Sequence, residues 1–278
     1  MSKDTLTALV PTFNEERNIR DCLTCLTWVD QLIVVDSFST DKTVEIAREF
    51  TDQVVQHEYV NSATQKNWAM STLPIKGEWT LIVDADERVV PQLAQEIQEM
   101  LAGEDPPYSG YFVNRRNIFF GHWVKRAGMY PNWNLRLFRT GQGVYETKEV
   151  DADVYLRDGG KVGYLRRDML HYSYPTVDSY VTRLNRYTTW DARERLKPKE
   201  MVDDKAIVAG ASGHARTLAR RVYEKLPAKP LALFLYMYLL KGGFLDGRVG
   251  FYTCGLWAFR EFVIDVKTWE LRQHREDQ

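Results

Sequence analysis

The stretch LIVDADERV, residues 81–89, joins a short apolar run to three acidic side chains, Asp84, Asp86 and Glu87. The apolar residues are typical of a buried strand, and the acids follow where that strand ends. If the chain stays extended there, the i, i+2 spacing places Asp84 and Asp86 on the same side. Two neighbouring carboxylates repel each other unless a cation or a hydrogen-bond donor lies between them. The stretch therefore predicts a bound positive charge at a strand end.

The first hundred residues repeat this pattern of a short apolar run followed by an amphipathic stretch. Strands are expected over 6–10, 31–36, 53–56 and 79–84, and helices over 15–27, 41–50, 62–71 and 91–102. Such alternation predicts an α/β fold with a mixed, mostly parallel sheet flanked by helices. Ligands of such sheets bind beyond the carboxyl ends of the strands. The candidate site is therefore formed by the polar stretches that follow three of these strands, PTFNEE, DSFSTD and DADE.

The pattern changes after residue 102. Short apolar runs such as GYFV, NLRLF and KVGYL are separated by Gly, Pro and Asn, which predicts an antiparallel or mixed extension of the sheet with long loops. From residue 176 the helical period returns. We expect a first domain over 1–175, divided near residue 102, and a C-terminal helical region over 176–278.

The C-terminal region contains LALFLYMYLL, residues 231–240, ten uncharged residues between Pro230 and Lys241. Ten helical residues reach about 15 Å, whereas a bilayer takes about 20 residues to span. This segment therefore does not cross a membrane as a single helix. Apolar, aromatic helices flanked by Lys and Arg can lie in the headgroup layer. Packing within the protein or self-association through residues 230–266 explains the composition equally well.

Composition excludes several classes of protein. With 37 Lys+Arg against 38 Asp+Glu, the chain carries no overall field that would attract nucleic acid. Three cysteines and an N-terminal segment with too short an apolar stretch for a signal peptide indicate the reducing cytoplasm. Cys22 and Cys25 form a C-x-x-C pair, but zinc takes four ligands and no second pair exists. Their helical spacing with Ile19 and Leu26 predicts the buried face of a helix instead.

Mg²⁺ or Mn²⁺ together with a diphosphate is the natural occupant of the acidic strand end, because these ions take oxygen ligands and leave positions open for phosphate. A D-x-D pair alone is weak evidence. The second strand supports it, since it also ends in an acid, Asp36, which could accept from ribose hydroxyls or a base N–H. Ser37, Ser39 and Asp41 after it are typical of a turn and a helix cap.

Taken together, these motifs resemble a known family. P-x-x-N-E-E after the first strand, V-V-D-S-x-S-x-D after the second and D-A-D-E after the fourth resemble the nucleotide-sugar domain of family 2 glycosyltransferases, which are inverting enzymes with the GT-A fold. SATQKNWAM resembles that family's Q-[KR]-N segment. YPNWNLRLFR, GVYETKEV, LHYSY and KGGFLDGRVGFY resemble the subgroup that includes lipopolysaccharide inner-core glucosyltransferases. The resemblance implies a GT-A catalytic domain over 1–175, with a donor half (1–102) and an acceptor half (103–175).

The resemblance also implies roles for individual residues. The nucleotide-sugar would be contacted by Pro11, Thr12, Glu15, Asp36, Lys66, Asp84 and Arg136. Asp86 would bind the metal, and His171 in LHYSY would complete the metal site. A structural role for His171 is the alternative, and His122 competes with it. Arg136 and Arg139 could instead form the exposed face of a strand.

An inverting transfer needs a base that takes the proton of the acceptor hydroxyl. The subgroup usually has His-Glu in its acceptor loop, whereas this chain has Tyr145-Glu146. The resemblance implies Glu146 as the base, and Glu149 is close enough to compete. Aromatic loops such as 117–133 would close over the site and exclude water.

We therefore expect a metal-dependent transferase of a hexose, first of all glucose, from a UDP-sugar to a lipid-linked saccharide such as a lipopolysaccharide core. It would be cytoplasmic, bound peripherally to the inner membrane, and a homo-oligomer is an open possibility. A sugar nucleotidyltransferase is one alternative, although PTFNEE lacks the Gly-rich loop and basic residue of such enzymes. A non-catalytic module that binds nucleotide or glycan is the other.

Overall fold

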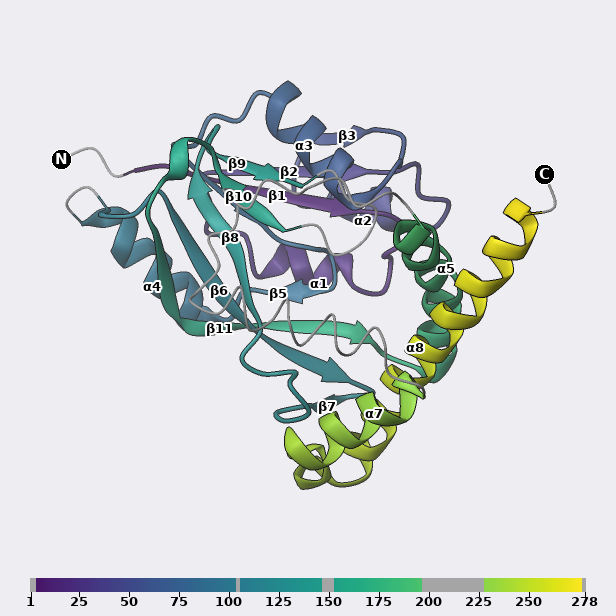
Figure 1. Ribbon diagram of the computed structural model, residues 1–278. Helices are drawn as coiled ribbons and strands as arrows, with labels where there is room; N and C mark the ends of the chain where they lie inside the picture. The colour runs from purple at the N-terminus through teal and green to yellow at the C-terminus, as the bar shows by residue number, and fades with distance from the viewer. Residues whose placement is uncertain (1–3, 104–105, 147–152, 197–227, 277–278) are drawn as a thin grey trace. The chain divides into compact units, whose positions relative to one another are not determined.

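The computed structural model describes residues 4–103, 106–146, 153–196 and 228–276 (Figure 1). The chain divides into two compact units. The first comprises Met1–Arg116 and Pro131–Ser173, and the second comprises Asn117–Tyr130 and Tyr174–Gln278. The first unit holds most of the sheet and the second holds the long C-terminal helices, so the predicted α/β fold with a helical extension is confirmed.

Four strands form the parallel half of a sheet that has nine strands within the described residues. In spatial order they are β3 (Val54–Gln56), β2 (Gln31–Asp36), β1 (Leu6–Thr12) and β4 (Trp79–Ile82). The last residues of β1 and β2, Thr12 and Asp36, are paired in register. Because β1, β2 and β4 are parallel, the loops that follow them leave from one edge of the sheet.

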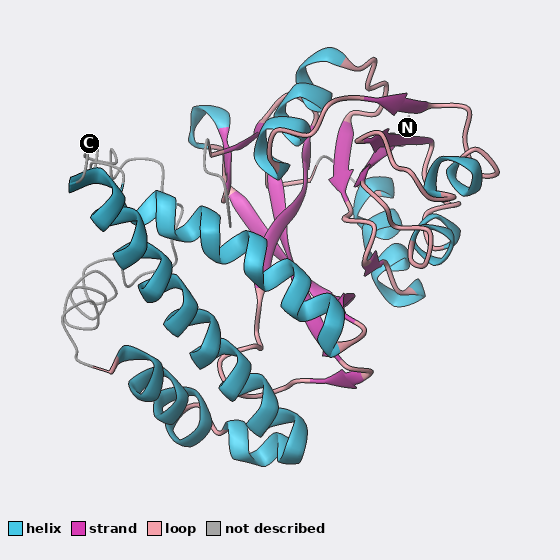
Figure 2. Cartoon of the chain, turned by 90° about the vertical axis from the view of Figure 1, so that its right-hand side faces the viewer, coloured by secondary structure: helices cyan, strands magenta, loops and turns pink. Residues whose placement is uncertain are grey.

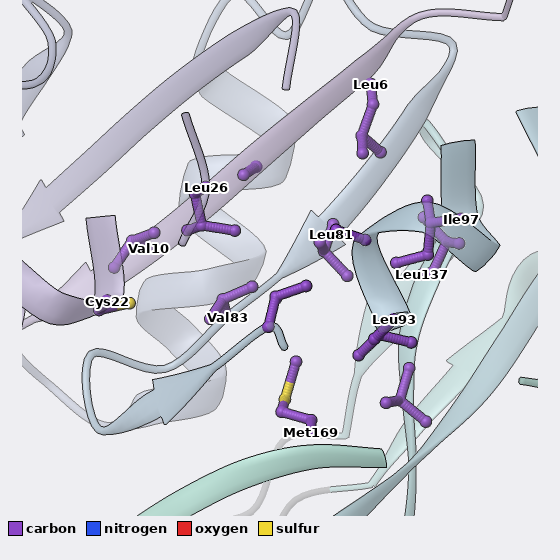
Figure 3. Packing of buried hydrophobic residues seen from close by; sticks show 14 of the residues in the cluster. Leu6, Val10, Cys22, Leu26, Leu81, Val83, Leu93, Ile97, Leu137 and Met169 are labelled. Atoms are coloured by element: carbon purple, nitrogen blue, oxygen red, sulfur yellow. The ribbon is translucent and has the colours of Figure 1, made fainter. Parts of the chain in front are cut away.

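Helices cover both faces of this half. They are α1 (Ile19–Thr24), α2 (Thr43–Ala47), α3 (Ser62–Thr72) and α4 (Pro91–Ala102). Successive strand residues point to opposite faces, so Leu81 packs with α1 and α4 while its neighbour Ile82 packs with α3. Figure 3 shows the first cluster, in which Cys22 of α1 lies among the leucines. Cys22 is fully buried on α1, as the helical spacing predicted, whereas Cys25 is the C-cap of α1 and half-buried; both are free thiols.

Antiparallel strands extend the sheet beyond β4. They are β8 (Trp133–Arg139), β6 (Gly110–Phe119), β11 (Val162–Tyr174) and β5 (Glu87–Arg88), with β7 (His122–Trp123) paired to β6. A separate hairpin joins β9 (Gly143–Tyr145) to β10 (Val154–Leu156), followed by a 3-10 turn η1 (Arg157–Gly159). The predicted mixed extension is therefore present. The short strand β5, which follows the acidic stretch and pairs with β11, was not predicted.

The second unit contains α5 (Val177–Leu196), α7 (Lys229–Leu235), a π-helical turn η3 (Tyr236–Leu240), a 3-10 turn η4 (Gly243–Asp246) and α8 (Gly247–Glu276). Helix α8 packs against both α5 and α7, and the three helices lie side by side in Figure 2. The Tyr180 hydroxyl donates to the Leu256 carbonyl at 2.9 Å, and Arg195 pairs with Glu261 at 2.8 Å. These contacts fix α5 against α8.

Residues 231–240 do not form one regular helix as their composition suggested, because the α-helix changes to a π-helical turn at Tyr236. The stretch 214–229, in which Leu218, Val222 and Leu226 alternate with basic residues at helical spacing, lies almost wholly outside the described residues. Among the residues that the structure describes, no helix is both long and apolar enough to cross a membrane.

Candidate active site

The loops after β1 and β2 are bound to each other at the carboxyl edge of the sheet. The backbone N–H groups of Asn14 and Glu15 donate to the hydroxyls of Ser39 and Thr43, both at 2.8 Å. The N–H of Thr40 donates back to the Asn14 side chain, also at 2.8 Å. The helix expected over 15–27 is shorter in the structure: α1 spans Ile19–Thr24 and follows a turn in which the N–H groups of Asn18 and Ile19 donate to the Glu15 carbonyl.

Asp36 ends β2 and is fully buried. Its carboxylate accepts from the Ser39 backbone N–H at 2.9 Å and from the Gln56 side chain at 3.1 Å. The first of these bonds closes the turn expected after the second strand. Asp36 thus shapes the loop that would face a base or ribose, beside the end of β1, where Pro11 is half-buried and Thr12 buried.

The acidic stretch after β4 is a turn, and the expectation of an extended chain there is wrong. The Glu87 N–H donates to the Asp84 carbonyl at 2.8 Å, and the Glu87 carboxylate accepts from the Asp84 N–H at 3.0 Å. Because the chain reverses, Asp84 and Asp86 do not share the side of a strand. The two carboxylates have different partners, and this separation resolves the repulsion that their spacing implied.

Asp84 is held by two cations. The Lys66 ammonium lies 2.7 Å from one carboxylate oxygen, and the Arg136 guanidinium donates to the other at 2.5 Å. Burial alone would raise the pKa of Asp84, but the charges of Arg136 and then Lys66 outweigh it and hold this pKa well below its usual range. Burial would likewise lower the pKa of Lys66, and the attraction of Asp84 raises it instead. All three groups are therefore charged at neutral pH.

Glu87 forms the inner layer of this cluster. Its side chain is fully buried and accepts from Arg136 at 2.6 Å and from Arg115 at 3.2 Å. Arg136 is thus shared between Asp84 and Glu87, which orients its guanidinium from two sides. Sequence reasoning noted Glu87 only as a third acid and missed Arg115, because their pairing depends on strands far apart in the chain.

Asp86 faces His171 instead. A ring nitrogen of His171, on β11, lies 3.6 Å from an Asp86 oxygen, and Ser173 contacts the imidazole at 3.0 Å. The pairing of β5 with β11 brings the two together, with His171 opposite Glu87 in the register. One oxygen and one imidazole nitrogen at this separation suit a divalent cation bound about 2.1 Å from each. Within the described residues no group of three or more His, Cys, Asp or Glu could hold a metal, so such an ion would need further ligands from substrate or water.

Helix α3 joins three parts of the site through consecutive residues. Gln65 donates to the Val35 carbonyl at 3.2 Å and also to a hydroxyl in the loop after β2, Lys66 binds Asp84, and Asn67 bonds β9. The Asn67 amide donates to the Tyr145 carbonyl and accepts from the Tyr145 N–H, both at 2.9 Å. Glu146, the predicted base, directly follows Tyr145 and is half-buried, whereas Glu149 lies outside the described residues.

Several buried polar atoms at this site have no hydrogen-bond partner among the described residues. Among them are the Thr12 hydroxyl at the end of β1, the Nε atoms of Arg115 and Arg136, and the Tyr145 hydroxyl, whose ring lies 5.1 Å from the Lys66 ammonium. Buried polar groups are nearly always paired, so orphaned ones indicate room for a polar ligand.

The remaining candidates lie elsewhere. Arg139 stacks over Trp79 at 4.9 Å and lies 3.8 Å from the Asp4 carboxylate. His122 lies on β7 in the second unit and is exposed.

Comparison with known proteins assigns the chain to a family. The model of glycosyl transferase family 2 matches residues 7–167, more than half of the chain and almost all of the sheet described above. The chain belongs to family 2 of the glycosyltransferases. It is therefore a transferase, and the predicted family is confirmed.

Relatives within the family align over most of their length. The lipopolysaccharide core biosynthesis glycosyltransferase LpsC of Rhizobium meliloti is 26% identical over 270 residues, which cover 95% of this chain and 92% of LpsC. An uncharacterized glycosyltransferase of Rickettsia bellii is 27% identical, covering 96% of this chain and 86% of its own length. Among solved structures, residues 1–349 of S. aureus TarS in complex with UDP-GlcNAc are 14% identical, with a TM-score of 0.47 over 97% of this chain and 92% of that one.

Proposed function

We propose that this glycosyltransferase transfers a hexose, first of all glucose, from a UDP-sugar to a lipid-linked saccharide with inversion at the anomeric carbon and with the help of Mg²⁺ or Mn²⁺. The observation that carries the proposal is that the two aspartates of DADE, Asp84 and Asp86, have different partners. Asp84 holds two cations at the strand end, while Asp86 is left to face His171. That arrangement suits a diphosphate and a metal ion bound side by side.

The donor half of the site would use the groups at the edge of β1, β2 and β4. Pro11, Thr12, Glu15 and Asp36 would surround the base and ribose. Lys66 and Arg136, already charged and oriented by Asp84, would turn part of their hydrogen-bonding capacity to the diphosphate. Their unpaired buried neighbours support a polar ligand at this place.

Asp86 and His171 would hold the divalent cation. When bound, such an ion offsets the negative charge that develops on a departing diphosphate. Because the Ser173 hydroxyl bonds the imidazole of His171, it would orient the ring toward Asp86.

Glu146 would take the proton of the attacking acceptor hydroxyl. Its backbone N–H donates to the Asp153 carbonyl at 2.9 Å, and the residue before it is fixed by Asn67, so the backbone that leads into Glu146 is positioned. A carboxylate held in this way can act as a general base if the acceptor hydroxyl comes within hydrogen-bond reach.

The second unit supports a membrane-borne acceptor at the cytoplasmic face of the inner membrane. Large apolar side chains are exposed along α7, η3, η4 and α8, among them Leu240 at 79% and Trp269 at 64% exposure. Lys241 and Arg248 lie on the same segment and are exposed. Aromatic and aliphatic residues with basic neighbours are typical of proteins that lie in the headgroup layer. The relationship to LpsC, which is named for lipopolysaccharide core biosynthesis, agrees with such an acceptor.

A thermal-shift screen tests the donor and the metal. UDP-glucose with Mn²⁺ should raise the melting temperature more than GDP- or TDP-glucose, and more than UDP-glucose without the ion, because a ligand that binds the native state stabilises it by mass action. If no nucleotide-sugar raises the melting temperature, the proposal fails. Vesicle flotation tests the membrane contact, and Leu240→Ser with Trp269→Ser should reduce it.

A further inference from the structure

A small apolar groove lies on the surface of the second unit, separate in sequence from every residue assigned to the active site. It has a volume of about 380 Å³ and is lined by Phe120, Val177, Phe251, Tyr252, Gly255 and Leu256. The lining comes from the turn between β6 and β7, the first residue of α5 and the N-terminal third of α8. Ligand pockets measure about 300–1,000 Å³, so this groove suits a narrow ligand.

The missing side chain of Gly255 forms the hollow. On α8 the exposed apolar residues Phe251, Phe259 and Phe262 recur at helical spacing, and Gly255 occupies the position between the first two of them. A Cβ atom at residue 255 would meet no heavy atom within 4 Å. Glycine is unfavourable inside a helix and is not required here for close packing, so its presence leaves free space.

The lining determines what kind of ligand fits. Among these six described residues, only Tyr252 carries a polar side-chain atom, and Tyr252 is exposed. A peptide or a sugar in the groove would lose hydrogen bonds to water and find almost no replacement. A hydrocarbon chain has none to lose and gains about 25 cal/mol for each Å² of apolar surface removed from water.

The residues next to the groove favour a lipid with a charged headgroup over a ligand that is apolar throughout. The exposed apolar residues Phe244 and Leu245 of η4 shortly precede the groove residues of α8 in the sequence. Arg248, which is exposed, lies one helical turn before Tyr252 and so on the same side of α8. An anionic headgroup could meet this cation while its chain enters the groove.

Phe120 is placed in the groove at a conformational cost. It has φ of +50° and is followed by Gly121 with φ of +78°, in the two-residue turn between β6 and β7. A left-handed conformation is unfavourable for a residue with a Cβ, but a two-residue hairpin turn requires it. The Phe120 N–H donates to the Tyr174 carbonyl at 3.0 Å, which holds the turn.

We propose that this groove binds one hydrocarbon chain of the lipid that carries the acceptor saccharide. The inference rests on the proposed lipid-linked acceptor and adds a binding site for its apolar part. The groove would hold the lipid by its chain, so that the saccharide is presented to the enzyme from a fixed anchor instead of from a freely diffusing membrane lipid.

Gly255→Leu in the full chain tests the groove, because the new side chain would extend into it from a Cβ position that meets no heavy atom within 4 Å. The probe is dioctanoyl phosphatidylglycerol at concentrations where it is monomeric, followed by titration calorimetry, with glycerophosphoglycerol as the same headgroup without chains. The wild-type protein should bind the first and not the second. Gly255→Leu should weaken binding of the first at least tenfold and Gly255→Ala by less, while the melting temperature does not fall, since both residues favour helix over glycine.

Phe262→Ser is the matched control. It removes an exposed apolar residue of α8 that does not line the groove, so it should reduce vesicle flotation while the affinity for the monomeric lipid is kept. Stabilisation of Gly255→Leu by UDP-glucose and Mn²⁺ is measured in parallel, so failure of the donor site is recognised separately. Equal affinity of wild type and Gly255→Leu for the lipid, absence of wild-type binding, or equal binding of the chain-free headgroup overturns the proposal. The proposal is also overturned if the wild-type protein sediments as a dimer and Gly255→Leu dissociates this dimer without changing the affinity for the lipid.

Discussion

The Lys66 ammonium on α3 lies 2.7 Å from the Asp84 carboxylate at the end of β4, and the Lys66 side chain is only 5% exposed. A buried lysine is normally driven toward its neutral form. Here Asp84 keeps it charged, although the Asp84 side chain itself remains 29% exposed. The site therefore holds a permanent cation whose partner is accessible from outside.

Removal of the Lys66 charge should affect both stability and donor binding. We expect Lys66→Met to lower the free energy of unfolding by about 1–3 kcal/mol, less than for a fully buried pair because Asp84 is partly exposed. Affinity for UDP-glucose should fall at least tenfold. Urea denaturation and calorimetry measure the two effects. Lys76→Met, at an exposed lysine, is the control, and an equal loss of donor affinity in both variants would contradict the role of Lys66.

Stability should fall at acid pH in a way that depends on Asp84. The pKa of Asp84 is lowered in the folded state, so its contribution is complete above the unfolded value near about 3.9 and is lost as the pH falls toward the folded value. Urea unfolding between pH 2 and pH 7 should show a shallower acid loss for Asp84→Asn than for wild type. The variant should also be less stable at pH 7, where two cations lose their partner. Parallel pH profiles of the two proteins would argue against this.

Metal dependence should follow Asp86 and His171. We expect Asp86→Ala and His171→Ala each to raise the Mn²⁺ concentration for half-maximal transfer at least tenfold, because each removes one of the two proposed protein ligands. His122→Ala is the control, as this exposed histidine lies in the second unit. A larger effect of His122→Ala than of His171→Ala would transfer the ligand role to His122.

Asn67 should act on turnover more than on donor binding. Asn67→Ala removes both hydrogen bonds to Tyr145, the residue before Glu146, at a cost of about 1–3 kcal/mol in stability. We expect kcat to fall several-fold while the melting-temperature increase caused by UDP-glucose is unchanged. Ser71→Ala tests the specificity, since this side chain bonds only within α3. Equal kcat for Asn67→Ala and wild type would show that the hydrogen bonds between Asn67 and β9 do not contribute to turnover.

The sequence allowed the strands of the parallel half and the helices α3 and α4 to be predicted to within two residues at each end, whereas α1 and α2 are shorter than the predicted 15–27 and 41–50. Strands such as 31–36 are buried on both faces and read as unbroken apolar runs, and that signal is local. The turn at Asp84 was missed, because it is closed by Glu87 and held by Arg136 from β8, 52 residues away in the chain. The short strand β5 was missed for the same reason, since it exists only by pairing with β11.

The same contrast between local signals and contacts of distant elements applies to the candidate site. Motif resemblance predicted roles for Lys66, Asp86 and His171, and the structure brings the last two within 3.6 Å of each other. It could not identify Arg115 or the link from Asn67 to β9, because neither residue type nor spacing encodes a contact between distant elements. Only the tertiary structure shows which cation pairs with which acid.

The three neighbouring contacts made by Gln65, Lys66 and Asn67 restrict how this helix can change over evolution. Inserting or deleting one residue ahead of them would rotate the trio by about 100° about the helix axis. All three strand ends would then lose their partners in one event. Exposed positions of α3 can be substituted without this loss, but the rotational position of the trio about the helix axis has to be kept. An insertion or deletion in α3 should therefore be among the rarest differences between active members of this lineage.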